Sequence, residues 1–245
     1  GIGLLTALTS FGASVHNTTT EIGSLTKLTS LYIGANGSPP SEIGLLTKLT
    51  SFKVNYSHKT SDTSMPSELG LMEALTSFQI AGYSVSCEIP SEIGMLTKLT
   101  SFVPGHCILP TEIGLLRNIR SLEMFGQFVK GALPSELGLL TALTKLVTAY
   151  SRTNGTIPTE VGKMVALRHL DLTGSKLSGS KLSGTLPSQV GLLRSLEDLS
   201  IGFNDLCGTL PSELLLLTNL KAIDISFNNF TGPLPAGLKF NSGLS

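Results

Sequence analysis

The sequence predicts an α/β solenoid, a right-handed superhelix with a parallel β-sheet on its concave face and short helical or 3-10 turns on its convex side. The first observation behind this prediction is repetition: PSEIGLLTKLTSF at residues 40–52 returns as PSEIGMLTKLTSF at residues 90–102. The second is that the phrase around EIG recurs in ten copies with a basic period of 24 residues. Repetition at this period is typical of solenoids, in which each coil packs only on its neighbours.

The repeat register assigns the whole chain to successive coils. The glycine of EIG or its equivalent is found at Gly3, Gly23, Gly44, Gly70, Gly94, Gly114, Gly138, Gly162 and Gly191, and Leu215 takes its place in the last copy. Because one coil cannot bury its own leucines, we expect residues 1–245 to form a single cooperative domain of about ten repeats. Residues 1–5, GIGLL, match the middle of the phrase, so we expect a fragment of a longer chain.

Each coil contains a short segment with the periodicity of a β-strand. In LEDLSIGFN at residues 196–204, apolar and polar residues alternate. A period of two buries one face of a strand, so we expect Leu199 and Ile201 to point into the core and Ser200 to point outward. Strands of successive coils would then form a parallel sheet with a spacing of about 4.8 Å.

The return path of most coils begins at Pro-Ser-Glu or Pro-Thr-Glu. The Ser or Thr after the proline is predicted to be a helix N-cap, and the Glu lies in the first turn, where the helix dipole favours negative charge. The apolar residues that follow are expected to turn inward as a short helical or 3-10 segment.

The two most regular copies read LEDLSIGFNDLCGTLPSEL at residues 196–214 and LKAIDISFNNFTGPLPAGL at residues 220–238. Their pattern, L-x-x-L-x-L-x-x-N-x-L-x-G-x-L-P, resembles the leucine-rich repeat in its plant-type form. The wording SEIGLLTKLTS is also similar to repeat arrays of diatoms and related algae. The resemblance implies a module that binds partners without catalysis. It also implies that Asn36, Asn204 and Asn228 turn inward and bond the backbone of neighbouring coils.

Composition and motifs exclude several classes of function. The 17 basic residues balance the 17 acidic residues, so charge does not favour a nucleic-acid or anionic-membrane partner. No run of eighteen apolar residues occurs, so no span of a bilayer is expected in this segment. The sequence also lacks the nucleophile-elbow, zinc-protease, P-loop and dinucleotide-binding patterns. We therefore expect no enzyme, no cofactor and no metal site.

Charged and aromatic residues gather on the outward strand positions of repeats six to ten, whereas Thr-Ser pairs precede the strands of repeats one to five. We predict that a protein, peptide or glycan binds the concave face of the later repeats, with charges around aromatic anchors. Solvated strand residues without a partner are an equally weighted alternative. The candidate residues are Arg120, Glu123, Phe125, Lys145, Tyr150, Arg168, His169, Asp171, Asp198, Phe203, Asp224 and Phe227.

Two other functions stay open from the sequence. The array could be a structural scaffold subunit of a larger assembly. The Thr and Ser columns of the first five repeats could instead bind ice or a polysaccharide, although Thr also suits a half-buried strand edge.

Sequons and cysteines favour an extracellular or cell-surface location through the secretory pathway. We predict glycans in outward loops, but not on Asn36, which is a position of the inward asparagine. The predicted glycan sites are Asn17, Asn55, Asn154 and Asn229. Cys87 and Cys107 each lie three residues before the proline of their repeat, so neighbouring coils bring them within disulfide range; three free thiols are the alternative.

Overall fold

The computed structural model describes residues 2–14, 20–56, 63–82, 87–105, 107–124, 130–150, 152–174 and 181–238. Two compact units divide the chain: unit 1 is Gly1–Ile119 and unit 2 is Arg120–Ser245. The prediction that residues 1–245 fold as one cooperative domain stays a prediction.

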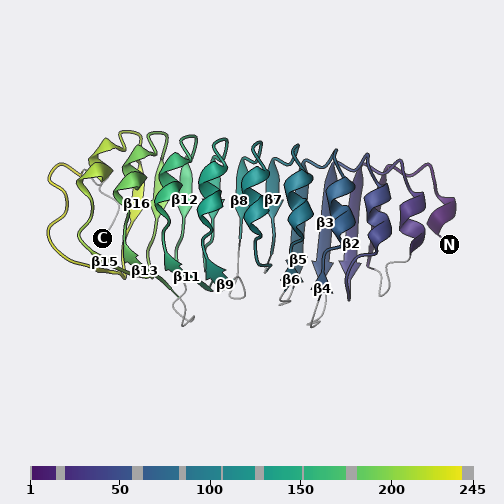
Figure 1. Cartoon of the computed structure of the whole chain (residues 1–245), viewed down its shortest axis with the longest axis horizontal. Coiled ribbons are helices and arrows are strands. Elements are labelled where there is room, and N and C mark those ends of the chain that lie inside the picture. Colours follow the sequence, from purple (N-terminus) through teal and green to yellow (C-terminus); the bar gives the residue numbers. More distant parts are fainter. Residues whose placement is uncertain are drawn as a thin grey trace. The chain divides into compact units, whose positions relative to one another are not determined.

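Unit 1 is a stack of coils in which strands of one parallel sheet alternate along the chain with 3-10 helices (Figure 1). Its parallel sheet has the strand order β1 (Ser10–Ser14), β2 (Ser30–Ala35), β3 (Ser51–Tyr56), β5 (Ser77–Gly82) and β7 (Ser101–Val103). Its helices are η1 (Ile2–Leu4), η2 (Thr20–Ser24), η3 (Ser41–Leu45), η4 (Ser67–Leu71), η5 (Ser91–Met95) and η6 (Thr111–Leu115). A second, short parallel pair joins β4 (Thr63–Ser64) to β6 (Cys87–Glu88).

Unit 2 has the same coil plan with two parallel sheets. The first has the order β8 (Ser121–Glu123), β10 (Lys145–Val147), β12 (His169–Asp171), β14 (Asp198–Ser200) and β16 (Ala222–Asp224). The second has the order β17 (Asn229–Phe230), β15 (Asp205–Gly208), β13 (Leu182–Thr185), β11 (Arg152–Thr156) and β9 (Lys130–Ala132). The helices are η7 (Ser135–Leu139), η8 (Thr159–Lys163), η9 (Ser188–Leu192) and η10 (Ser212–Leu216).

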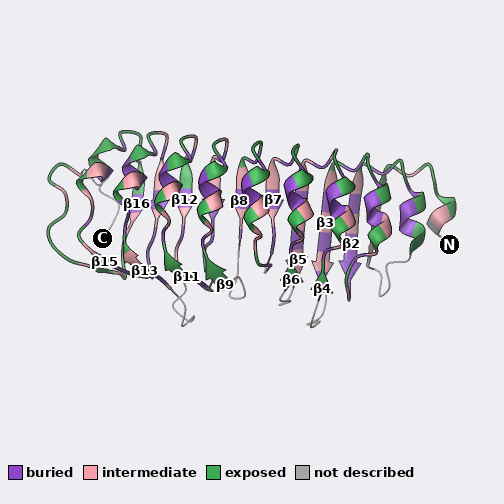
Figure 2. Ribbon diagram, viewed as in Figure 1, coloured by how far each residue is buried: buried purple, intermediate pink, exposed green. Residues whose placement is uncertain are grey.

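The core of each unit lies between its strands and its 3-10 helices, where residues are buried (Figure 2). Leu199 and Ile201 are each 0% exposed while Ser200 is half-buried, so the predicted inward register is confirmed. In unit 1, Phe52 stacks on Phe78 with a ring-centroid separation of 5.4 Å. Equivalent residues therefore stack directly over one another, which is the packing that the repeat predicts.

The inward asparagine of the repeat bonds several coils together in unit 2. Asn204 is 2% exposed, its Oδ1 accepts the Leu182 amide at 3.1 Å, and its Nδ2 donates to the Leu172 carbonyl at 2.9 Å and the Ile201 carbonyl at 3.1 Å. Asn228 repeats the pattern while half-buried. Asn36 of unit 1 is also only half-buried.

The predicted N-cap is wrong. In η3 the N-cap residue is Pro40, in extended conformation, and no side chain caps the helix. The Pro40 carbonyl accepts the Ile43 amide at 3.2 Å, which closes the first 3-10 turn and makes Ser41 the first helical residue. The Ser41 hydroxyl instead donates to Glu42 Oε2 at 3.3 Å. Proline fills this position because its missing N–H costs nothing at a helix start.

The Thr column of unit 1 is part of the internal bonding. The Thr50 hydroxyl donates to the Thr29 carbonyl of the preceding coil at 3.0 Å, and Thr76 and Thr100 repeat the bond to Thr50 and Thr76 at 3.0 Å each. Each hydroxyl therefore helps to hold one coil against the next, in addition to the sheet hydrogen bonds.

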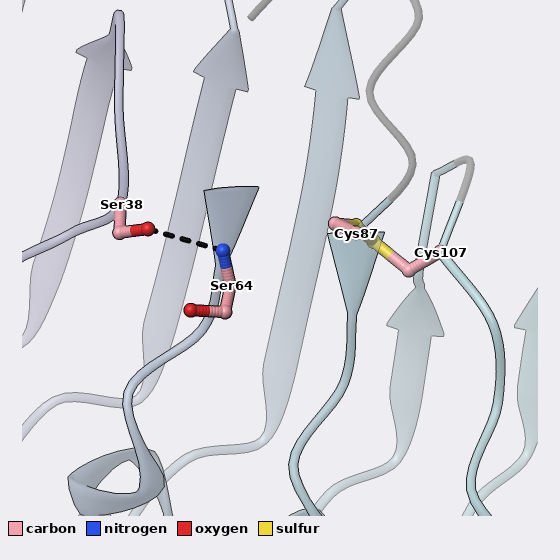
Figure 3. The surroundings of a disulfide bond; sticks show 4 residues. All are labelled: Ser38, Ser64, Cys87 and Cys107. Atoms are coloured by element: carbon pink, nitrogen blue, oxygen red, sulfur yellow. Dashed lines mark hydrogen bonds between the residues drawn. A yellow bond between two sulfur atoms is a disulfide. The ribbon is translucent and has the colours of Figure 1, made fainter. Parts of the chain in front are cut away.

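A disulfide joins neighbouring coils of unit 1 (Figure 3). It links Cys87 to Cys107, whose Cα atoms are 4.5 Å apart. On the preceding coils the Ser64 amide donates to Ser38 Oγ at 3.0 Å, so polar and covalent links occupy the same edge of the stack. Cys207 of unit 2 is free and exposed.

We expect reduction of the Cys87–Cys107 disulfide to lower the free energy of unfolding by about 3 kcal/mol, because the bridge restricts the conformational entropy of the unfolded chain. The bridge spans 20 residues. Thermal unfolding followed by far-UV circular dichroism, with and without dithiothreitol, measures the effect. The double substitution Cys87→Ser with Cys107→Ser removes the bridge. Its midpoint should therefore be the same with and without dithiothreitol, and should equal that of the reduced wild type. Sensitivity of this double variant to dithiothreitol would contradict the assignment.

Candidate partner-binding surface

The strand face of unit 2, meaning the outward positions of β8, β10, β12, β14 and β16 together with the residues that flank these strands, carries most of the predicted site. The parallel register sets Lys145 beside His169, and His169 beside Asp198. Glu123 and Asp224 lie at the ends of β8 and β16. Phe125 lies outside the described residues.

Charges of neighbouring strands pair with one another across this face. Lys145 Nζ lies 3.0 Å from Glu123 Oε1, which also accepts the Ser121 hydroxyl at 2.8 Å. His169 Nδ1 lies 2.6 Å from Asp198 Oδ2. These side chains are partly exposed, so each pair contributes little to stability, but each fixes where a charge sits on the face.

Glu197 lies on the same charged surface as the predicted residues, and the sequence-based list omitted it. Its carboxylate accepts a hydrogen bond from Lys221 Nζ at 2.6 Å and one from Arg168 Nη1 at 2.9 Å. These bonds, with the larger contribution from Lys221, lower the pKa of Glu197 below its ordinary value. One position of the repeat carries Arg168, Glu197 and Lys221, and also the exposed Arg120. The recurrence of charged residues at this position was the sequence signal that could have identified Glu197.

Asp171 and Asp224 have a local structural role. Asp171 Oδ1 accepts the Thr173 amide at 2.9 Å. Asp224 Oδ1 accepts both the Ser226 amide at 2.9 Å and the Ser226 hydroxyl at 2.6 Å. Each carboxylate therefore holds the turn that follows its strand, and Phe227 lies just after the turn held by Asp224.

Three aromatic residues lie beyond the ends of β10, β14 and β16, each with a left-handed backbone. The φ angles are 59° at Tyr150, 56° at Phe203 and 52° at Phe227. Tyr150 is 63% exposed and Phe227 is 68% exposed. The rings of Phe203 and Phe227 stack with a centroid separation of 4.3 Å and an interplanar angle of 14°. Unit 2 thus presents solvent-exposed aromatic surface beside the paired charges.

At Tyr150 and Phe203 the left-handed backbone accompanies hydrogen bonds to the next coil. The Tyr150 amide donates to the Thr173 carbonyl at 3.0 Å, and the Phe203 amide donates to the Ser226 carbonyl at 2.9 Å. The Phe203 carbonyl in turn packs against Gly174, where a Cβ would overlap it. A positive φ is costly for a bulky residue and cheap for glycine or asparagine, and nothing in the local sequence signals it.

The predicted glycan sites have different surroundings. Asn154 on β11 and Asn229 on β17 are exposed. Asn55 lies in strand β3 rather than in a loop, half-buried, and its Nδ2 donates to the Tyr32 hydroxyl at 3.3 Å. Asn17 lies outside the described residues. The expected loop placement is wrong for Asn55, Asn154 and Asn229, which lie in β3, β11 and β17, although the last two are exposed as expected.

Neither a cluster of metal-binding side chains nor a membrane-spanning helix is found in the described residues. No group of three or more His, Cys, Asp or Glu side chains in these residues is placed to hold a metal ion. Over the same residues, the helices are too short or too polar to cross a membrane.

Comparisons with known proteins agree with the coil geometry. The sequence profile described as Leucine Rich Repeat matches residues 219–241, and no curated protein sequence matches the chain significantly. A leucine-rich repeat protein of Leptospira interrogans gives a TM-score of 0.76 at 23% identity, over 95% of this chain and 58% of that chain. An internalin of Listeria monocytogenes gives 0.70 at 21% identity, over 96% of this chain and 73% of that chain.

A plant receptor is also similar. The ectodomain of the Arabidopsis receptor kinase HAESA, in complex with a peptide hormone, gives a TM-score of 0.62 at 25% identity, over 90% of this chain and 34% of that chain. These likenesses show that the fold is a leucine-rich repeat solenoid that resembles receptor ectodomains. The chain spans only 58% of the Leptospira protein and 34% of the HAESA chain.

Proposed function

We propose that the chain is the non-catalytic recognition array of an extracellular or cell-surface protein, and that it binds a peptide or protein segment through the strand face of unit 2. The observation that carries this proposal is the set of aromatic side chains with a left-handed backbone. A fold that only stacks coils is served better by glycine or asparagine at these positions, since both accept a positive φ and neither exposes an apolar ring.

The chemistry of the face suits a peptide. Exposed aromatic rings such as Phe227 supply apolar area that a bound side chain can cover, and aromatic anchors dominate the affinity of many interfaces. The neighbouring acidic and basic groups are held in ion pairs. The face therefore presents both positive and negative charges to the backbone and side chains of a partner. The peptide-bound ectodomain of HAESA is consistent with this use of the fold.

The alternatives receive less support. A glycan partner and a scaffold role remain predictions from the sequence, as does the resemblance to plant-type and algal arrays. Binding to ice or to a polysaccharide through the Thr column is disfavoured, because the hydroxyls of Thr29, Thr50, Thr76 and Thr100 already donate to carbonyls of neighbouring coils.

The binding proposal is tested with peptides selected on the immobilised chain from a phage-displayed random library. The double substitution Phe203→Asn with Phe227→Asn should weaken their binding at least about tenfold in isothermal titration calorimetry. Its thermal midpoint should be unchanged or higher, because asparagine accepts a positive φ more readily than phenylalanine. A merely structural role for the rings predicts the opposite, a lowered midpoint with unchanged affinity.

The matched control is Tyr32→Asn, which removes a half-buried aromatic residue from the strand face of unit 1 and should leave affinity unchanged. If Tyr32→Asn loses binding and the double variant keeps it, the binding site lies on unit 1, near Lys53, and not on unit 2. A selection in which no peptide binds with a dissociation constant below about 1 mM would overturn the proposal. Reversing Arg168 or Lys145 is a poorer test, since each would then face the carboxylate it now binds.

The extracellular part of the proposal is supported by the Cys87–Cys107 disulfide, since such bonds persist in oxidising compartments. We expect mass spectrometry of glycopeptides from the native source to find glycans on Asn154 or Asn229, which are exposed, and none on Asn36. Modification of Asn55 and Asn17 stays a prediction, and the bond from Asn55 to Tyr32 makes Asn55 the weaker acceptor. Finding every sequon bare would remove this support.

A further inference from the structure

The charges on the strand face of unit 2 are sorted by sign along the strand direction. The residues that immediately precede the five strands form the leading row: Arg120, Thr144, Arg168, Glu197 and Lys221. The last residues of the same strands form the trailing row: Glu123, Val147, Asp171, Ser200 and Asp224. Because neighbouring strands are parallel and in register, each row crosses the sheet from β8 to β16 (Figure 1). Three residues along a strand separate the rows by about 10 Å.

The leading row keeps a positive charge after its internal ion pairs are counted. Glu197 binds both Arg168 and Lys221, so these two cations and one anion leave a net charge of one. Arg120 is exposed and forms no ion pair with any residue that the structure describes. The edge of the face at the start of the strands is therefore positive.

The trailing row keeps a negative charge. The carboxylate of Glu123 is matched by Lys145 at 3.0 Å. Asp171 and Asp224 have no cation as a partner among the described residues, and Val147 and Ser200 contribute no charge. The edge at the end of the strands is therefore negative, so the two edges of one face have opposite signs.

The negative edge also borders exposed aromatic surface. Tyr150 lies beyond the end of β10 and Phe227 beyond the end of β16, and they are 63% and 68% exposed. Carboxylates and aromatic rings together suit a guanidinium, which binds a carboxylate through two N–H groups and stacks on a ring. A lysine ammonium lacks the planar shape for both contacts, so this edge favours arginine over lysine.

We propose that the partner of unit 2 is an extended peptide segment that crosses the strands, with acidic side chains along one side and arginines along the other. The proposal rests on the peptide-binding function proposed above and specifies its ligand. Successive side chains of an extended chain point to opposite sides. A segment between the rows therefore turns alternate residues toward Arg120 and the leading row, and the intervening residues toward Asp171 and Asp224.

The sorting of charge also disfavours other ligands on this face. A uniformly acidic or uniformly basic segment would be attracted by one edge and repelled by the other. A segment parallel to the strands would carry both of its sides from the positive edge to the negative edge, so alternation of charge would give it no advantage. Only a segment that crosses the strands gains from having one sign on each side.

Two synthetic octapeptides of identical composition and net charge test the proposal. One contains four Asp-Arg repeats, so an extended chain has all acids on one side and all arginines on the other. The second contains two Asp-Asp-Arg-Arg repeats, so each side carries both signs. In fluorescence anisotropy with the full chain, the first should bind at least about tenfold more tightly than the second. Equal affinities, or a dissociation constant above about 1 mM for the first peptide, would overturn the proposal.

The double substitution Asp171→Asn with Asp224→Asn tests the negative edge. Each asparagine keeps an oxygen for the backbone amide that the carboxylate now accepts, and only the charge is lost. The Asp-Arg peptide should bind this variant at least about fivefold more weakly. The matched control is Glu136→Gln with Glu160→Gln, which removes two exposed or half-buried carboxylates from the helices η7 and η8 of the same unit. Equal losses in both variants would show that binding follows net charge alone, and would overturn the proposal.

The preference for arginine is tested by replacing all four arginines of the Asp-Arg peptide with lysine. The charges and their alternation are unchanged, so any loss of affinity reports the planar guanidinium. We expect at least about threefold weaker binding. Equal binding of the lysine peptide would contradict the assignment of arginine to the aromatic edge.

Peptides selected by phage display on the immobilised chain separate this inference from the proposed function. If selected peptides depend on Phe203 and Phe227 but show no alternation of acidic residues with arginine, the inference fails and the peptide-binding function stands. If no peptide binds, both fail. Alternating acidic residues and arginines among the selected sequences are the expected result.

Discussion

Replacing Leu199 with alanine is expected to lower the free energy of unfolding by about 2–5 kcal/mol. Leu199 is 0% exposed and lies in β14, where it pairs in register with Leu170 on one side and Ile223 on the other. Removing its side chain leaves a cavity between stacked equivalents, and coils held by sheet hydrogen bonds on both sides cannot collapse to fill it.

Urea denaturation followed by far-UV circular dichroism measures the effect of Leu199→Ala. The neighbouring substitution Ser200→Ala is the control: its side chain points outward from the same strand and is half-buried, so a change within about 0.5 kcal/mol is expected. Equal effects of the two substitutions would contradict the assigned register, because they would imply that both faces of β14 are packed alike.

Replacing Asn204 with alanine is expected to lower the free energy of unfolding by about 3 kcal/mol. The Asn204 side chain satisfies the Leu182 amide and the carbonyls of Leu172, Ile201 and Gly202 in a site where it is 2% exposed. Alanine removes the bonds to the buried Leu182 amide and Leu172 carbonyl, whereas the Ile201 and Gly202 carbonyls keep bonds from Asn228 and the Gly174 amide. Each buried group left unsatisfied carries its own desolvation penalty.

Two further variants separate the causes of this loss. Asn204→Asp keeps an oxygen for the Leu182 amide but loses the donor to Leu172, so it should remain destabilised. Asn228→Ala should cost less, because Asn228 is half-buried and water can replace part of its bonding. A larger loss in Asn228→Ala than in Asn204→Ala would contradict the view that burial sets the size of the effect.

The sequence by itself determined the coil, its register and its core. The L-x-L alternation placed Leu199 and Ile201 inside, and the asparagine of the pattern placed Asn204 between coils. These features depend on a residue's position within its own repeat, and the same local pattern recurs along the chain. Repetition makes such a pattern readable, since neighbouring coils supply the same surroundings to each copy.

Only the tertiary structure decided the remaining features, because they depend on how one coil is offset from the next. The pairing of Arg168 with Glu197 joins residues 29 apart, across the longest repeat, and the sequence gives no rule for which charges meet there. The positive φ of Phe203 accompanies a hydrogen bond to the next coil and a close approach of its carbonyl to Gly174, which the residue's own repeat does not reveal. The close approach of Met95 to Gly70 of the preceding coil likewise depends on how tightly the coils stack.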